Sequence, residues 1–200
     1  MAPSPAWQEH EVPPLPMMAQ EAHVPEIDLS SMQPGDAAAA LRSFPRRYRD
    51  AARTAATDLD GEPDEAALEE MARRPGPDGW SATDVVTAAA DRLADAHDVL
   101  TRALVTDTAV PSHLTATPSQ VPSGGSGTME DALGRLDASS TRLAEVVDDA
   151  DPERWTATLP VDDGGTTTPL QLLQTSVAPV VVWIREVDKV LRAVRGRPRS

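Results

Sequence analysis

The chain has no cysteine among its 200 residues and few aromatic side chains. Without cysteine, disulfides, thiolate metal sites and a cysteine nucleophile are excluded. Aromatic residues make up 3% of the sequence, with one Phe and one Tyr, whereas alanine and valine are abundant. Helices of such a chain must pack through small side chains.

Basic residues are also scarce. The sequence has 18 Lys and Arg against 32 Asp and Glu, which gives a formal net charge of -14. Phosphate backbones and anionic membrane surfaces bind basic protein faces. Nucleic acid and membranes are therefore disfavoured as main partners.

Long apolar runs are missing as well. The longest, residues 177–184, is far shorter than the ~18 residues that a membrane-spanning helix needs. The N-terminal segment has neither a positive start nor an apolar core, so we expect no secretory signal. The sequence predicts a cytoplasmic protein.

The strongest helical pattern lies in residues 164–194. Thr168 can cap a helix, Pro169 suits a first helical position, and Gln171 stands at the capping-box position. Apolar residues then recur at three-four spacing for about seven turns. They are Leu170, Leu173, Val177, Val180, Val181, Ile184, Val187, Leu191 and Val194. This stripe predicts the central helix of a bundle.

Residues 36–60 form the first predicted helix, with Asp36 as its cap. Pro45 lies inside the apolar stripe and predicts a kink or a break near Phe44. A short amphipathic helix is expected in residues 63–74. The polar face of the first helix carries Arg42, Arg46, Arg47, Arg49 and Arg53, and a solvated face is favoured there over an anion site.

A long connection separates the next two helices. Ser81 and Asp84 make a capping box at the start of the first of them. Thr128 or Ser126 begins the second. The stretch between, residues 105–127, is rich in Pro, Ser, Thr and Gly, and it is too long for a tight turn. It therefore predicts a crossover in an all-α four-helix bundle.

The predicted organisation has three parts: an acidic Pro-rich arm (1–35), the bundle (36–195) and a basic tail (196–200). Seven prolines in the arm preclude long regular structure. The arm either extends along the bundle or is a leader without fixed structure. Its His10 and His23 stand beside acids and are weak candidate metal ligands.

Two segments resemble the DinB-like superfamily. Residues 74–86, RPGPDGWSATDVV, look like the start of that family's second helix, where Trp-Ser follows a Pro/Gly loop. Residues 178–190, APVVVWIREVDKV, are similar to an actinobacterial branch. That branch contains the N-terminal domains of mycothiol-dependent maleylpyruvate isomerases and has a Pro shortly before Arg-Glu-Val. The resemblance spans roughly residues 36–195.

The resemblance implies a divalent metal, such as Zn(II) or Ni(II), held by three side chains. One ligand is implied on the second helix, eight residues after the Trp, and two more lie four residues apart on the fourth. Ligands at i and i+4 share one helix face, and a facing helix completes the triangle. Such a metal would activate water or a thiol such as mycothiol.

The sequence departs from this pattern. Ala88 stands at the position of the first ligand. The isomerase-like register places the other two at Glu186 and Val190, and the general DinB register places them at Ser176 and Val180. At most Glu186 survives as a metal ligand, and an ion pair with a basic side chain is its favoured role.

We therefore predict a metal-free, degenerate DinB-like bundle that binds a small ligand or a protein partner. Loss of the ligands would leave a small apolar pocket lined by Val180, Trp183 and Val190, facing Ala88 and Ala89. A second interpretation within the binding class is a homodimer formed through a helix face. The alternative is a metal-dependent, mycothiol-using transferase or isomerase with an atypical ligand set, which would need stoichiometric metal.

Overall fold

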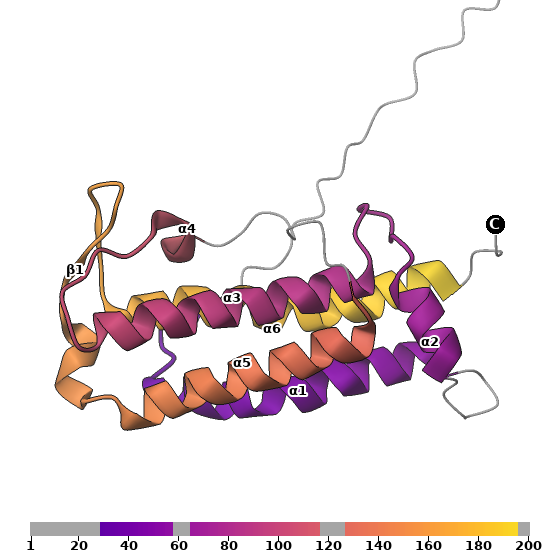
Figure 1. Cartoon of the computed structure of the whole chain (residues 1–200), viewed down its shortest axis with the longest axis horizontal. Helices are drawn as coiled ribbons and strands as arrows, with labels where there is room; N and C mark the ends of the chain where they lie inside the picture. Colours follow the sequence, from indigo (N-terminus) through magenta and orange to yellow (C-terminus); the bar gives the residue numbers. More distant parts are fainter. Residues whose placement is uncertain (1–28, 58–64, 117–126, 196–200) are drawn as a thin grey trace, which may run out of the picture.

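The computed structural model describes residues 29–57, 65–116 and 127–195, so most of the N-terminal arm and the basic tail lie outside it. The described chain is mostly helical, which confirms the predicted all-α class (Figure 1). The long helices are α1 (Pro34–Ala56), α3 (Ala82–Ala103), α5 (Met129–Asp149) and α6 (Pro169–Arg195). The shorter elements are α2 (Glu65–Ala72), α4 (Ser112–Thr115), η1 (Pro152–Thr156), β1 (Leu159–Pro160) and β2 (Thr166–Thr167).

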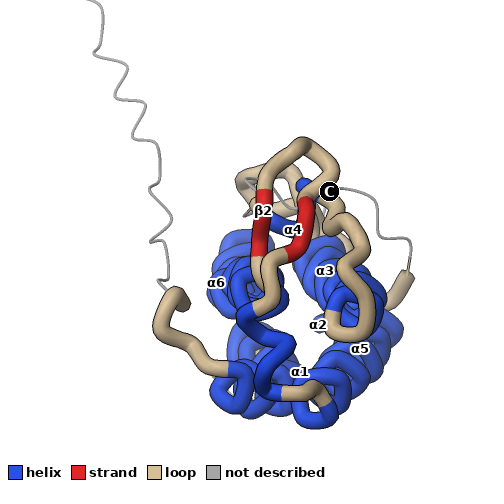
Figure 2. The backbone as a smooth tube through the Cα atoms, turned by 90° about the vertical axis from the view of Figure 1, so that its left-hand side faces the viewer, coloured by secondary structure: helices blue, strands red, loops and turns tan. Residues whose placement is uncertain are grey.

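The long helices surround one core. Helix α1 packs against α5 and α6, and α3 packs against the same two helices, so α1 lies diagonal to α3 (Figure 2). Figure 1 shows α1 and α6 running in one direction and α3 and α5 in the other. Because α3 and α5 are parallel neighbours, the chain must return along the bundle between them. This geometry requires the long connection.

Helix α1 differs from its prediction at its start, at Pro45 and at its end, which is Ala56, followed by Thr57 in an extended conformation, rather than residue 60. It begins at Pro34, inside the predicted arm, and Asp36 is not the cap but accepts the backbone N–H of Gln33 at 3.1 Å. Of the kink or break expected at Pro45, the break is absent, because the helix continues through this residue. Proline has a helical φ and removes only one hydrogen bond, and burial of the neighbouring Phe44 offsets that loss.

The predicted caps of the other three long helices are confirmed. The N–H of Gln171 donates to Thr168 Oγ1 at 3.1 Å, and the N–H of Thr168 donates to Gln171 Oε1 at 3.0 Å. Ser81 and Asp84 make the same reciprocal pair at the start of α3. Thr128, rather than Ser126, caps α5. These bonds satisfy N–H groups that have no partner within the helix.

Pro179 lies within α6 and has no N–H, so the carbonyl of Thr175 lacks its helical donor. Arg92 of α3 supplies a donor, because its Nη2 lies 3.2 Å from that carbonyl oxygen. The same guanidinium donates to the carbonyls of His113 (2.8 Å), Leu114 (2.9 Å) and Ala116 (3.1 Å). Arg92 is 8% exposed, and burial lowers its pKa. It ties α3 to α6 and to the α4 segment.

A small ribbon closes one end of the bundle. Strands β1 and β2 pair antiparallel, and Val110 from the long connection bridges to Val161 beside them. Arg154 of η1 donates from Nε to the carbonyl of Leu104 at 3.0 Å. The connection is thus anchored where α3 ends.

Tyr48 joins α1 to α6 inside the core. Its hydroxyl donates to the carbonyl of Val180 at 2.7 Å, and the ring is fully buried. Burial raises the pKa of Tyr48 well above its ordinary value. The phenol is the only tyrosine in the chain, so its titration can be isolated.

We expect Arg92→Leu to lower the free energy of unfolding by about 3 kcal/mol, because it leaves buried carbonyls without donors. In the Pro179→Ala background the Thr175 carbonyl regains its helical N–H. The loss caused by Arg92→Leu should then be smaller by about 1 kcal/mol. Urea unfolding of the four proteins in this cycle measures the difference. Additive losses would contradict the proposed link.

Tyr48 should make stability fall at high pH. Its folded pKa is raised, so the folded state keeps the proton where the unfolded chain has lost it. Its contribution is complete below the unfolded pKa of about 10 and declines above it by about 1.4 kcal/mol per pH unit. Tyr48→Phe should remove this slope in urea unfolding from pH 9 to 11. Equal slopes in both proteins would refute the assignment.

Candidate functional site

The positions at which the resemblance implies metal ligands lie on neighbouring helices. Helices α3 and α6 pack directly against each other. On α3, Ala88 is 5% exposed and Ala89 is fully buried, and on α6 both Ser176 and Val180 are fully buried. Trp183 is 7% exposed. These side chains are part of the bundle core.

The two positions of the isomerase-like register, Glu186 and Val190, lie under the loop that precedes α3. A Cβ added at Gly76 of this loop would stand 3.1 Å from Val190 Cγ2, so the backbone lies directly on that valine. Lys189 Nζ lies 2.6 Å from Asp78 Oδ2 and 3.1 Å from Glu186 Oε1. The Glu186 carboxylate therefore has a basic partner, which is Lys189 of its own helix.

Lys189 links this loop to α6 electrostatically. The hydrogen bond to Asp78 raises the pKa of Lys189, partial burial opposes it, and the hydrogen bond to Glu186 adds to the rise. The lysine side chain is 52% exposed. Solvent-exposed ion pairs contribute little to stability. They join Asp78 of the loop to Lys189 and Glu186 of α6.

The family model of the DinB superfamily matches residues 46–178, which is more than half of the chain. This chain belongs to the DinB superfamily. Neither the curated proteins nor the solved structures contain a match. The matched range includes Ala88 and Ser176. Membership of the maleylpyruvate isomerase-like branch stays a prediction.

The residues of this DinB-superfamily bundle do not fit the metal centre that the resemblance implies. Alanine and valine have no donor atom, so one register offers only the Ser176 hydroxyl and the other only the Glu186 carboxylate. Within the described ranges, no three His, Asp or Glu side chains are grouped as metal ligands would be. His97 pairs with its neighbour Asp98 at 2.9 Å. His10 and His23 lie outside the described residues.

Ser176 is unusual among these positions. Its Oγ is buried and makes no hydrogen bond within the described part of the chain. A buried hydroxyl without a partner destabilises a fold because it has lost its hydration. The same holds for Ser140 of α5.

A pocket of about 620 Å³ lies elsewhere, where α2 folds across the end of α1 beside the start of α5. Its apolar wall consists of Ala52, Leu68, Met129 and Leu133. Sequence reasoning missed it, although Gly134, inside a helix, was a signal. The apolar pocket expected around Trp183 stays a prediction.

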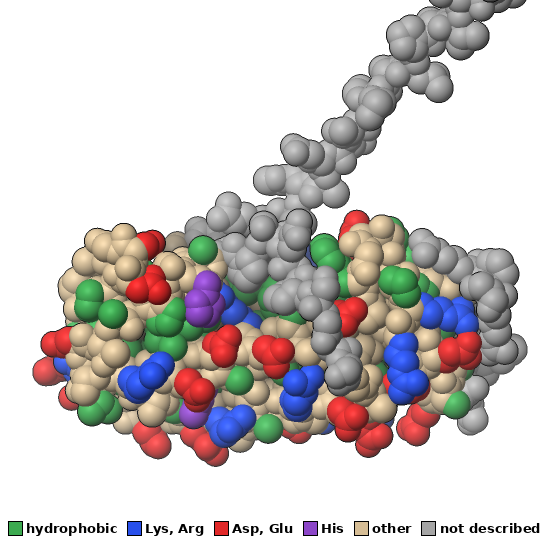
Figure 3. Space-filling model, turned by 45° about the horizontal axis from the view of Figure 1, so that its top comes forward, with side chains coloured by type: hydrophobic (Ala, Val, Ile, Leu, Met, Phe, Trp, Pro, Cys, Tyr) green, Lys and Arg blue, Asp and Glu red, His purple; other side chains and the backbone are tan. Residues whose placement is uncertain are grey.

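The surface carries charges of both signs. On the face in Figure 3, acidic and basic side chains are interspersed rather than gathered into a field of one sign. Of the large hydrophobic side chains in the described ranges, Val105 stands out at 78% exposed. None of the described helices is both long and apolar enough to cross a membrane.

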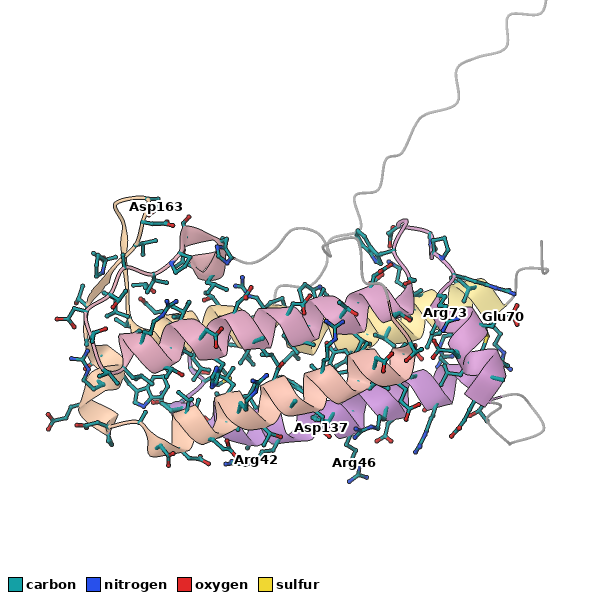
Figure 4. The ribbon with its side chains drawn as sticks, viewed as in Figure 1. Arg42, Arg46, Glu70, Arg73, Asp137 and Asp163 are labelled. Atoms are coloured by element: carbon teal, nitrogen blue, oxygen red, sulfur yellow. The ribbon has the colours of Figure 1, made fainter. Side chains whose placement is uncertain are left out.

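Two arginines of α1 pair with acids of α5. Arg42 pairs with Asp148, and Arg49 pairs with Asp137 at 3.3 Å, so both arginines join α1 to α5. Figure 4 shows Arg42 and Asp137 on the side of the bundle that α1 and α5 form. These pairs are partly exposed and contribute modestly.

We expect Ser176→Ala to raise the free energy of unfolding by about 1 kcal/mol, because it removes a buried hydroxyl without a partner. Ser140→Ala should act in the same direction. Ser43→Ala is the control, since the Ser43 hydroxyl donates to the Ala40 carbonyl at 2.7 Å and its removal should bring no such gain. Urea unfolding measures all three. Destabilisation by Ser176→Ala would show that this hydroxyl is used.

Proposed function

We propose that this DinB-superfamily chain is a small-molecule-binding protein that works without a metal at the family's core position. The pocket between α1, α2 and α5 carries the proposal. Its volume of about 620 Å³ is within the range of ligand sites, and an apolar wall with a few polar groups is typical of them.

The packing at the metal positions supports this reading. Val180 and Val190 are fully buried and Ala88 is 5% exposed, so they act as core side chains. Burial of these apolar side chains favours a structural role for them in the packing of α3 and α6. The ligand would then bind in the pocket between α1, α2 and α5 rather than between α3 and α6.

The surface favours a small molecule over an extended protein interface. Protein-binding faces usually present contiguous exposed apolar area. Among the described residues, large hydrophobic side chains are almost all buried or half-buried, with Val105 as the exposed exception. A protein partner or a homodimer is therefore the weaker reading.

We expect purified protein to carry substoichiometric metal. Added Zn(II) or Ni(II) should shift the melting temperature by less than about 1 °C. A metal present at 100 times its dissociation constant would instead add about 2.7 kcal/mol, which corresponds to a rise of several degrees. Elemental analysis and thermal melts with and without chelator measure both quantities.

One metal per chain, with a clear rise in melting temperature, would contradict the proposal. It would favour the alternative, a metal-dependent thiol transferase or isomerase with an atypical ligand set. Glu186→Gln would then be the first variant, with Glu145→Gln, an exposed glutamate on α5, as its control. Loss of metal in the first variant alone would assign the ligand.

A further inference from the structure

Gly134 leaves part of the wall of the α1/α2/α5 pocket without a side chain. It lies within α5 and lines the pocket, and a Cβ added there would meet nothing within 4 Å. Packing therefore does not require glycine at this position. A helix-interior glycine costs roughly 1 kcal/mol relative to alanine. The chain thus has a destabilising glycine at a position where a larger side chain would fill the pocket.

Two of the charged groups around the pocket already have partners. Arg49 pairs with Asp137 at 3.3 Å. Glu69 accepts the backbone N–H of Met129 at 3.2 Å and 3.0 Å with its two oxygens, and Arg73 lies 2.9 Å from its Oε1. Glu69 thus occupies the N-terminus of α5, where a carboxylate is favoured by the helix dipole. An anionic ligand can bind the N-terminus of α5 only if it displaces the Glu69 carboxylate.

Three charged groups of the lining remain for a ligand. Glu65 and Glu130 are exposed carboxylates, and Arg53 is an exposed guanidinium. None of the three forms an ion pair with another residue of the described ranges. Two carboxylates against one guanidinium leave an excess of negative charge. The chain's net charge of -14 acts in the same direction.

We propose that the pocket binds an amphipathic amine: an apolar body against Leu68, Met129 and Leu133, with a protonated amino group toward Glu65 and Glu130. This inference rests on the proposed binding function and adds the chemical class of the ligand. The apolar wall supplies affinity, and the carboxylates select the sign of the charge.

Three probes with the same eight-carbon body test the inference: n-octylammonium, 1-octanol and octanoate. Titrations followed by the amide signals of α1, α2 and α5 in nitrogen-15 NMR spectra locate and quantify binding. We expect octylammonium to bind about tenfold more tightly than octanoate, with octanol between them. If none of the three shifts these amides, the proposed binding function fails. If octanoate binds as tightly as octylammonium, only the charge preference is wrong.

Gly134→Leu should fill the pocket and weaken octylammonium binding at least about tenfold, while helix propensity keeps the variant folded. Ala138→Leu is the matched control, because Ala138 is exposed one turn further along α5 and does not line the pocket. Both variants keep the net charge, so general attraction of a cation to an acidic protein cannot explain a difference. Unchanged binding by Gly134→Leu would overturn the assignment of the site.

Charge variants test the contacts to the amino group. Glu130→Gln should weaken octylammonium binding about three- to fivefold and leave octanol binding unchanged. Glu145→Gln removes the same charge from an exposed position of α5 outside the pocket, and it should change binding less than twofold. Arg53→Gln should strengthen octylammonium binding. Equal effects of the two glutamate variants would refute the role of Glu130.

Discussion

The guanidinium of Arg92 holds together three segments that are distant in sequence. It is buried, and its donors reach carbonyl oxygens in α6 and in the segment around α4. One of these carbonyls, that of Thr175, needs an outside donor because Pro179 cannot provide the helical one. A proline that weakens α6 is thus compatible with the core because a buried arginine completes the hydrogen bonding.

The direction of the helices has consequences at both ends of the bundle. Because α3 and α5 are parallel neighbours, the connection between them leaves α3 at one end and reaches α5 at the other (Figure 1). At the first end, Arg154 and the bridge from Val110 to Val161 hold it. At the other end, α2 covers the start of α5, and the pocket lies between them. The crossover therefore brings the start of α5 to the pocket that α1 and α2 also line.

Local chemistry explains which predictions were accurate. The caps at Ser81, Thr128 and Thr168 involve residues three positions apart, so the sequence alone contains both partners. Pro45 was expected to kink or break α1, and the structure shows no break there. Propensity describes the isolated helix, whereas burial of the surrounding stripe decides the outcome in the bundle.

The sequence by itself determined the helical class and the helix starts at Ser81, Thr128 and Thr168, because these depend on residue identity and short spacing. The chain belongs to the DinB superfamily, and at the positions where the resemblance implies metal ligands it includes Ala88 and Val180, whose side chains carry no donor atom. Only the tertiary structure decided that Arg92 meets the Thr175 carbonyl and that Glu69 occupies the N-terminus of α5. Such contacts join residues far apart in the chain, and only helix packing determines which of them meet.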